Sequence, residues 1–212
     1  TMGDTTTWRT PDNVPRELLQ ASNLPAALIV QAEQCEWPTK RPAVQAAQRW
    51  AAGEVQGLCL TGDVGVGKTC LAATATLARL ATCKLPRRAP HGSHTWHDPA
   101  APMWVSMAQL LVQLRSGFGT DMRSGAQHLV GTRCAVVFDD FDKINPTANA
   151  LEVVFAALDA RIQAGASVLI TTNLPVGKFA VGWPQPLGQA IASRIAGYCQ
   201  VVRMGGKDRR LP

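Results

Sequence analysis

The sequence contains few charged and few aromatic residues, and it has no long apolar run. Charged residues make up 17% of the chain and aromatic residues 6%, with a single tyrosine. No apolar stretch approaches the ~18 residues that a membrane-spanning helix needs, and the N-terminal region lacks the apolar core of a signal peptide. These absences argue against a membrane or secreted protein and predict a cytoplasmic one. The hydrophobic fraction of 46% predicts a globular fold.

The cysteines include no C-x-x-C pair. Several of them stand in apolar surroundings, which is typical of buried thiols that behave as small hydrophobic residues. We therefore expect free thiols in a reducing compartment. The six residues are Cys35, Cys59, Cys70, Cys83, Cys134 and Cys199.

The chain carries an excess of positive charge, with a formal net charge of +6. Part of the excess lies at residues 84–88 and part at residues 207–210. A basic surface suits a polyanion such as DNA. A solvated face that keeps the protein soluble explains each cluster equally well, so charge alone does not identify a partner.

Apolar strands alternate with helical patterns along most of the chain. Helices broken by prolines are expected between residues 10 and 55, and five apolar runs follow, with helices between them. This alternation predicts an α/β fold with a five-stranded parallel sheet covered by helices on both faces. The predicted strands are 57–62, 102–107, 134–140, 167–173 and 199–205, and the predicted helices follow Gly67 and span 108–118, 147–164 and 187–197.

The segment "GDVGVGKT" matches the phosphate-loop pattern G-x-x-x-x-G-K-[ST] without mismatch. It follows an apolar strand and opens a helix, where glycines let successive backbone N–H groups point at one anion. Lys68 is expected to bind the β- and γ-phosphates of ATP, and the Thr69 hydroxyl to ligate Mg²⁺. The alternative is a glycine-rich turn of purely structural importance. The predicted nucleotide-binding residues are Gly62, Asp63, Val64, Gly65, Val66, Gly67, Lys68, Thr69 and Cys70.

Polar side chains end two later strands. Asp139 and Asp140 end "VVFDD", and Asn173 ends "LITTN". Because parallel strands present their carboxyl ends to one edge, these residues are expected beside the phosphates. We expect Asp139 to support Mg²⁺ through water, Asp140 to act as general base, and Asn173 to hold the attacking water. The alternatives are acids that cap a helix and an asparagine that only ends a strand.

These motifs together resemble the AAA+ ATPases of the DnaC/DnaI helicase-loader group and the closely similar IstB-type transposition helper ATPases. The resemblance runs from about Asn23 to Arg210. It implies a P-loop NTPase of the ASCE type over residues 23–212, with residues 1–22 as an N-terminal tail or partial linker. The segments that carry it are "NLP", "GLCLTGDVGVGKTCLAAT", "WVSMAQLLVQLRSGF", "VVFDDFDK", "VLITTNLP", "ASRI" and "GKDRR".

The resemblance also implies roles for single residues. Asn173 is similar to the sensor 1 asparagine. Arg194, in its S-R-I setting, is similar to the arginine finger that acts in trans between head-to-tail subunits, although it also suits an ordinary solvated helix position. Arg210, in G-x-D-x-R, is similar to the sensor 2 arginine. Asp140 stands where many relatives carry the longer Glu, and Asp-Asp also occurs in this family.

In this group, helices between the second strand and the acidic strand help to bind single-stranded DNA. They correspond loosely to residues 106–131. Arg115 and Phe118 are candidate DNA contacts there, because a cation and an aromatic ring hold backbone and bases without reading sequence. Phe118 suits a hydrophobic core equally well.

The sequence departs from the loader pattern at two places. Loaders carry a separate N-terminal segment that grips the helicase, and little precedes Asn23; either the partner docks differently or the chain is a truncated ATPase core. The second departure is the Pro-rich connection 83–102, which contains His91, His94 and His97. Three alternatives remain for this connection: a mobile surface loop, a contact with a partner or nucleic acid, and a zinc site. The zinc site lacks a clear fourth ligand.

The leading functional hypothesis is a helicase loader. Such a protein hydrolyses ATP to ADP and phosphate with Mg²⁺, forms a head-to-tail homo-oligomer, binds single-stranded DNA and helps to deliver a hexameric replicative helicase. The closest alternative is a transposition helper ATPase that binds duplex DNA and a transposase. Two further alternatives are an ATP-switched DNA-binding module that does not hydrolyse ATP, and a small-molecule P-loop kinase.

Overall fold

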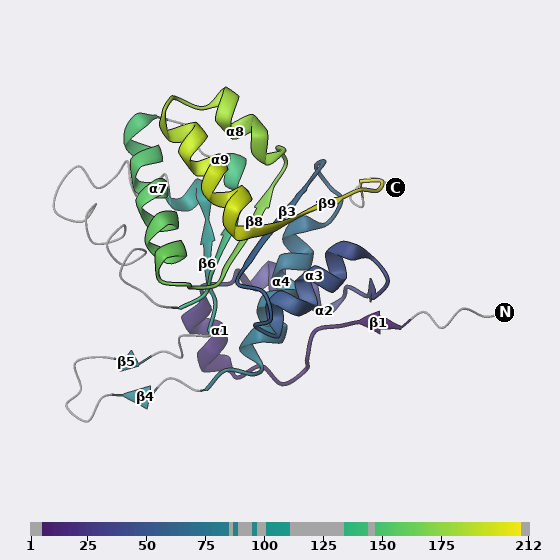
Figure 1. Ribbon diagram of the computed structural model, residues 1–212. Coiled ribbons are helices and arrows are strands. Elements are labelled where there is room, and N and C mark those ends of the chain that lie inside the picture. The colour runs from purple at the N-terminus through teal and green to yellow at the C-terminus, as the bar shows by residue number, and fades with distance from the viewer. Residues whose placement is uncertain are drawn as a thin grey trace.

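The structure, a computed structural model, describes residues 6–84, 87–88, 95–96, 101–110, 134–143 and 147–208. At its centre lies a five-stranded parallel sheet with the strand order β6-β7-β8-β3-β9 (Figure 1). This arrangement confirms the predicted α/β fold. The strands are β3 (Gly57–Gly62), β6 (Met103–Ser106), β7 (Val136–Asp139), β8 (Val168–Thr172) and β9 (Cys199–Met204).

The sheet separates two hydrophobic cores. Every residue of β3, β7 and β8 is buried. Leu58 and Leu60 of β3 belong to one core, whereas Cys59 between them belongs to the other. Val137 and Phe138 of β7 divide between the cores in the same way. Because both faces are covered, apolar side chains are favourable at successive positions, which explains the absence of a period-2 pattern.

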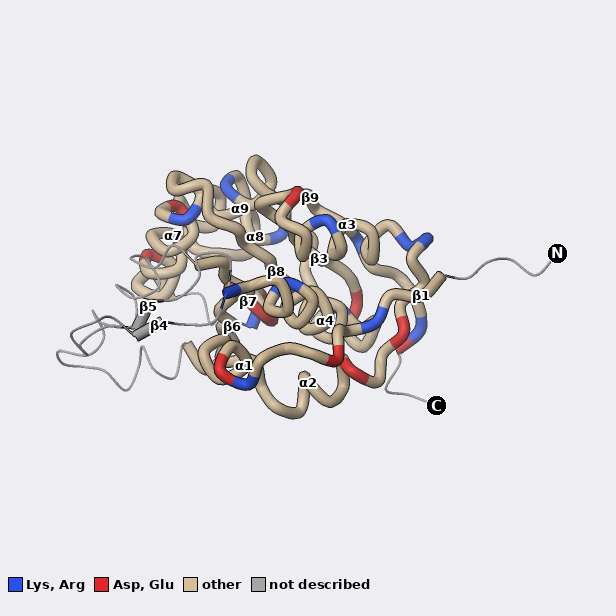
Figure 2. The backbone as a smooth tube through the Cα atoms, turned by 90° about the horizontal axis from the view of Figure 1, so that it is seen from below, with Lys and Arg blue, Asp and Glu red and all other residues tan. Residues whose placement is uncertain are grey.

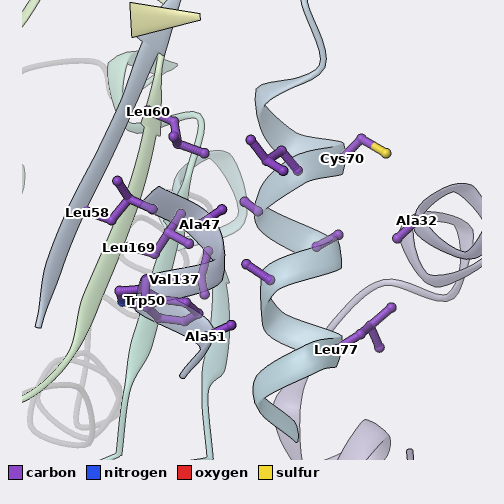
Figure 3. Packing of buried hydrophobic residues seen from close by; sticks show 14 of the residues in the cluster. Ala32, Ala47, Trp50, Ala51, Leu58, Leu60, Cys70, Leu77, Val137 and Leu169 are labelled. Carbon is purple, nitrogen blue, oxygen red and sulfur yellow. The ribbon is translucent and has the colours of Figure 1, made fainter. Parts of the chain in front are cut away.

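The first core lies between the sheet and helices of the N-terminal half. Helix α4 runs between the sheet and α2 (Figure 3). Its residues Ala72, Ala73 and Ala75 are completely buried, and these small side chains allow the sheet and helices to approach closely. The helices of this half are α1 (Arg16–Ser22), α2 (Ala26–Glu33), α3 (Pro42–Ala51) and α4 (Lys68–Leu80).

The second core lies under helices α7 (Ala148–Gln163), α8 (Val176–Gly182) and α9 (Leu187–Tyr198), which cover the other face (Figure 1). Aromatic rings fill the space between β7 and α8. The ring centroid of Phe141 lies 6.0 Å from that of Phe138 and 5.7 Å from that of Phe179. Such edge contacts add to the stabilisation that burial provides. Phe141 begins the short 3₁₀ helix η1 (Phe141–Lys143), so this packing also fixes the chain directly after the acidic strand.

The predicted elements agree closely with the observed ones. Each predicted strand ends within one or two residues of the observed strand, and α7 and α9 agree to within one residue at each end. Helix α8 was not predicted, because it is short and carries no clear period. Two short antiparallel ladders were also missed, since two-residue strands carry no pattern. They pair β1 (Thr7–Trp8) with β2 (Trp37–Pro38) and β4 (Arg87–Arg88) with β5 (Thr95–Trp96).

Several predictions concern residues outside the described part of the chain. Residues 107–110 are helical, as expected for the start of the predicted helix 108–118, and the rest of that helix lies outside the described residues. His91, His94 and His97 also lie outside them. The domain boundary at residue 23 stays a prediction. None of the helices in the described part of the chain has the length and apolar composition that crossing a bilayer requires.

A buried arginine joins α4 to α3 and to the start of β8. Arg79 donates hydrogen bonds to the Trp50 carbonyl and to Ser167 Oγ, both over 3.0 Å. Its guanidinium carbon lies 4.9 Å from the centroid of the Trp50 ring. Ser167 in turn donates to Gln56 Oε1 over 2.6 Å. The network connects the residues before β3 and β8, which are neighbouring strands of the sheet.

We predict that Arg79→Ala lowers the free energy of unfolding by about 2–4 kcal/mol, because two buried hydrogen-bond acceptors lose their donor. Urea denaturation measures the change. The matched control is Arg49→Ala, which removes an exposed ion pair with Glu54 at 3.6 Å and is expected to cost less than about 0.5 kcal/mol. Equal losses in the two variants would contradict a structural role for the buried network.

Candidate functional site

The glycine-rich loop connects β3 to α4 and depends on three unusual backbone conformations. Gly62, Gly65 and Gly67 have φ values of +146°, +80° and +98°, which favour glycine. Gly62 also lies directly against the carbonyl of Met204 on β9, so the space offers no room for a side chain. The loop therefore keeps its shape through local glycines and through the neighbouring strand.

Lys68 lies at the first position of α4 and is buried, with 5% of its surface exposed. Its ammonium group donates to the carbonyls of Gly62 and Asp63 over 2.8 and 2.7 Å. It also donates to Asn173 Oδ1 over 2.9 Å. The sequence predicted that Lys68 and Asn173 lie at one edge of the sheet, and the structure brings them into direct contact.

Asp139, the last residue of β7, is buried beside Thr69. Its Oδ1 accepts hydrogen bonds from Thr69 Oγ1 over 3.0 Å and from Thr171 Oγ1 over 2.7 Å. Burial raises the pKa of the Asp139 carboxyl, and the nearby Asp140 raises it further, while the Thr171 and Thr69 hydrogen bonds act in the opposite direction. A desolvated carboxylate next to a hydroxyl provides the hard oxygen ligands that Mg²⁺ prefers. Thr69 and Asp139 therefore fit the predicted magnesium site.

Asp140 follows β7 in a left-handed backbone conformation with φ +54°. Its backbone N–H donates to Thr171 Oγ1 over 2.9 Å, and Asp140 also lines the pocket described below. Aspartate is one of the few residue types that adopt this conformation readily. Thr171 thus contacts both Asp139 and Asp140. The sequence analysis missed this role, although a threonine within an otherwise apolar strand could have indicated it.

Asp142 holds Asn173 in place, and this role too was missed. It accepts from the Asn173 backbone N–H over 2.7 Å and from Asn173 Nδ2 over 2.9 Å. Burial alone would raise the pKa of Asp142, but the hydrogen bonds from Asn173, together with those from its own backbone and from Thr172, outweigh burial and lower the pKa. Because Nδ2 is engaged by Asp142, Oδ1 of the amide is the atom directed at Lys68.

A pocket of about 370 Å³ opens at this edge of the sheet. Lys68, Thr69, Asp140 and Asn173 all line it, so the structure brings the main predicted site residues together. Val66, which was also predicted to bind the nucleotide, is buried with 3% of its surface exposed and is not among the residues that line the pocket. The remaining lining residues are Leu28, Gln31, Cys35, Val64, Gly65, Gly67, Cys70 and Lys143.

One wall of the pocket was not predicted. Leu28 and Gln31 of α2, with Cys35 just after it, face the phosphate loop across the pocket. A helix pattern in residues 26–33 does not reveal what the helix packs against, so this wall follows only from tertiary structure.

Arg194, the predicted arginine finger, does not line the pocket of its own chain. Arg194 on α9 forms an ion pair with Asp159 of α7, with Nε 2.6 Å from Oδ1, and its side chain is 47% exposed. Arg210, Arg115 and Phe118 lie outside the described residues. Acidic and basic residues are spread over many elements of the described chain (Figure 2).

The chain is similar in fold to solved replication proteins. A structure of DnaI has a TM-score of 0.62 at 19% identity, covering 92% of this chain and 94% of that one. A structure of the DnaC helicase loader has a TM-score of 0.58 at 17% identity, with coverage of 78% and 92%. The replication initiator DnaA bound to AMPPCP and single-stranded DNA has a TM-score of 0.57 at 15% identity, with coverage of 79% and 46%.

The sequence itself also has a family match. The model of the family described as IstB-like ATP binding protein matches residues 17–212. Comparison with curated proteins finds no significant match. The family match begins inside α1 and includes every described residue of the pocket.

We predict that Asp139→Asn stabilises the ligand-free protein at pH 7. A carboxyl whose pKa is raised by folding lowers the free energy of unfolding once the pH exceeds its pKa in the unfolded chain, which is ~3.9. The gain in stability of the variant over wild type therefore shrinks toward pH 4. Stabilisation by Mg²⁺–ATP, about 2.7 kcal/mol for wild type at about 100 times Kd, is expected to fall sharply in the variant. Thermal unfolding from pH 4 to 7, with and without Mg²⁺–ATP, measures both effects; a variant less stable than wild type at pH 7 without ligand would contradict the effect of burial.

Proposed function

This chain belongs to the family of IstB-like ATP-binding proteins, and we propose that it is an ATPase that loads a replicative helicase onto single-stranded DNA. The observation that carries the proposal is the convergence of Lys68, Thr69 and Asn173 on one pocket at the carboxyl edge of the sheet. The fold similarity to the DnaI and DnaC structures supports the loader in preference to other ATPases.

Nucleotide binding requires Lys68 to exchange partners. The ammonium group gives up the Gly62 and Asp63 carbonyls for the β- and γ-phosphate oxygens, while the N-terminus of α4 directs backbone N–H groups at the same anion. Thr69 and Asp139 would hold Mg²⁺, with Asp139 acting through water, and the ion would neutralise phosphate charge. The hydrogen bond to Asn173 already holds the Lys68 ammonium group at the edge of the sheet where the phosphates are proposed to bind.

Hydrolysis requires a water placed in line with the γ-phosphate. In the proposed reaction Asp140 accepts a proton from that water, and the Asn173 amide, oriented by Asp142, holds it. The Asp140 carboxyl is one methylene shorter than the Glu of many relatives. The left-handed backbone at Asp140 sets the direction from which its carboxyl approaches.

Arg194 is proposed to complete the site of a neighbouring subunit. Its side chain is half-exposed on α9 and is not part of its own pocket, which suits a role in trans. Docking of a subunit would require Arg194 to exchange the Asp159 carboxylate, whose side chain is 18% exposed, for the phosphates of the neighbouring site. Arg210 is proposed to contact the phosphates of its own subunit.

We expect Arg194→Ala to retain ATP binding and to lose most turnover, because an arginine finger acts on transition-state charge. Mixed with equal Asp140→Ala protein, it should regain turnover at about a quarter of the interfaces, as head-to-tail assembly implies. Steady-state phosphate release measures both. Two variants are the controls. Lys68→Ala should lose affinity for ATP, and Lys178→Ala, at an exposed position on α8, should change neither ATP binding nor turnover. No recovery on mixing would rule out action in trans.

The family match specifically favours a second candidate function, that of a transposition helper that binds duplex DNA and hands sites to a transposase. Both candidates use the same ATPase site, so DNA preference and partner distinguish them. A DNA-binding switch that does not hydrolyse ATP would bind nucleotide tightly with near-zero turnover.

For a loader we expect ATP-dependent binding to single-stranded over duplex oligonucleotides, with turnover raised by the single strand. Phe118→Ala should weaken that binding by about tenfold, because stacking contributes about 1–3 kcal/mol per base. Fluorescence anisotropy at fixed salt measures affinity. A preference for duplex, together with a stable complex with a transposase and none with a helicase, would establish the helper function instead.

A further inference from the structure

Two cysteines of the nucleotide pocket lie in direct contact. The sulfurs of Cys35 and Cys70 are 2.8 Å apart, although the residues are 35 positions apart in sequence. Cys35 follows α2, and Cys70 is in the first turn of α4. Figure 3 shows the Cys70 side chain pointing away from the sheet, toward the α2 side of the molecule. The contact therefore joins the two elements that face each other across the pocket.

The remaining four cysteines have different surroundings. Cys59 and Cys199 are buried in the second core. Burial raises the pKa of Cys199 to about 12 and that of Cys59 as well, with Cys199 adding to the effect on Cys59, so both thiols stay protonated and unreactive. Cys83 and Cys134 are half-buried, like Cys35, but belong to separate segments of the chain.

We propose that Cys35 and Cys70 form an oxidisable dithiol, a modification site in the pocket wall whose reagent is a peroxide. The half-buried Cys35 thiolate attacks one peroxide oxygen, the O–O bond breaks, and Cys35 becomes a sulfenic acid as the other oxygen leaves as water or alcohol. Cys70 sulfur then attacks the Cys35 sulfur, the S–O bond breaks, and water leaves with the Cys70 proton. Two thiols and one peroxide thus give one disulfide, one water and one further water or alcohol.

The geometry requires little movement. A disulfide has a sulfur–sulfur distance of about 2.05 Å, so the two atoms close by less than about 1 Å. Cys35 lies beyond Gln34, the C-cap residue of α2, and can move without breaking a helix. Cys70, which is only 6% exposed, stays in place as the resolving thiol.

The disulfide would fix one wall of the pocket relative to the other. Leu28 and Gln31 lie on the α2 side, and Lys68 and Thr69 immediately precede Cys70. A covalent bond between these sides prevents them from separating, so nucleotide exchange should slow. This consequence rests on the proposed function, whereas the thiol chemistry does not.

The test treats the reduced chain with hydrogen peroxide, alkylates the remaining thiols with N-ethylmaleimide, and identifies linked peptides by mass spectrometry without reduction. The expected result is an intramolecular Cys35–Cys70 peptide, a mass lower by about 2 Da from loss of two hydrogens, and recovery of both thiols with dithiothreitol. The midpoint of thermal unfolding should rise by several degrees, because the bond restricts the unfolded chain.

Two matched variants check the assignment. Cys35→Ser should abolish the linked peptide and the thermal shift, whereas Cys83→Ser, at a thiol of similar exposure outside the pocket, should leave both unchanged. Cys59 and Cys199 serve as internal controls within wild type. Alkylation of Cys35 and Cys70 to the same extent as Cys83 after peroxide would overturn the proposal, as would a linked peptide made only between molecules.

Repeating the peroxide treatment in the presence of nucleotide distinguishes this proposal from the proposed function. Mg²⁺–ATP added before peroxide should slow disulfide formation, because it fills the pocket that Cys35 lines. If the disulfide forms at the same rate with and without ATP, the dithiol is upheld and its coupling to nucleotide is overturned. If ATP binds and no disulfide forms, the dithiol is overturned and the proposed function is unaffected.

Discussion

The hydrogen bond from Lys68 Nζ to Asn173 Oδ1 is the contact on which the site depends, because it joins the first residue of α4 to the residue that follows β8. Parallel pairing of β3 with β8 and of β7 with β8 brings the ends of three strands to one edge. The polar atoms at these ends then partner one another: Thr171 contacts both acids, and Asp142 orients Asn173. Lys68, Asp139 and Asp142 are therefore held by hydrogen bonds before a ligand arrives, and such preorganisation is what the proposed ATPase would require.

The sequence was sufficient to predict Lys68, Thr69, Asp139 and Asn173 at one edge, because a local loop pattern combined with the geometry of a parallel sheet. It was not sufficient for Asp142, whose role depends on the turn that Phe141 begins by packing into the second core. The α2 wall was missed for a related reason. Apolar periodicity shows that a helix buries one face, but the partner of that face is decided by tertiary packing.

The described site also shows why the two candidate functions are difficult to separate. The roles proposed for Lys68, Asp139 and Asn173 all concern nucleotide chemistry, and a loader and a transposition helper have the same need for it. Specificity for DNA and for a protein partner must therefore come from other surfaces. The spread of charged residues over many elements (Figure 2) means that net charge alone does not mark such a surface in the described chain.

The position of β3 within the sheet has a consequence for biosynthesis. Its two neighbours, β8 and β9, are more than a hundred residues downstream in the chain. A nascent chain that has emerged only as far as α4 contains the complete phosphate loop, but no strand yet flanks β3. Long-range pairing of this kind slows folding and leaves apolar edges exposed meanwhile. The ability to bind nucleotide should thus be acquired only after β9 has been synthesised and has completed the sheet beside β3.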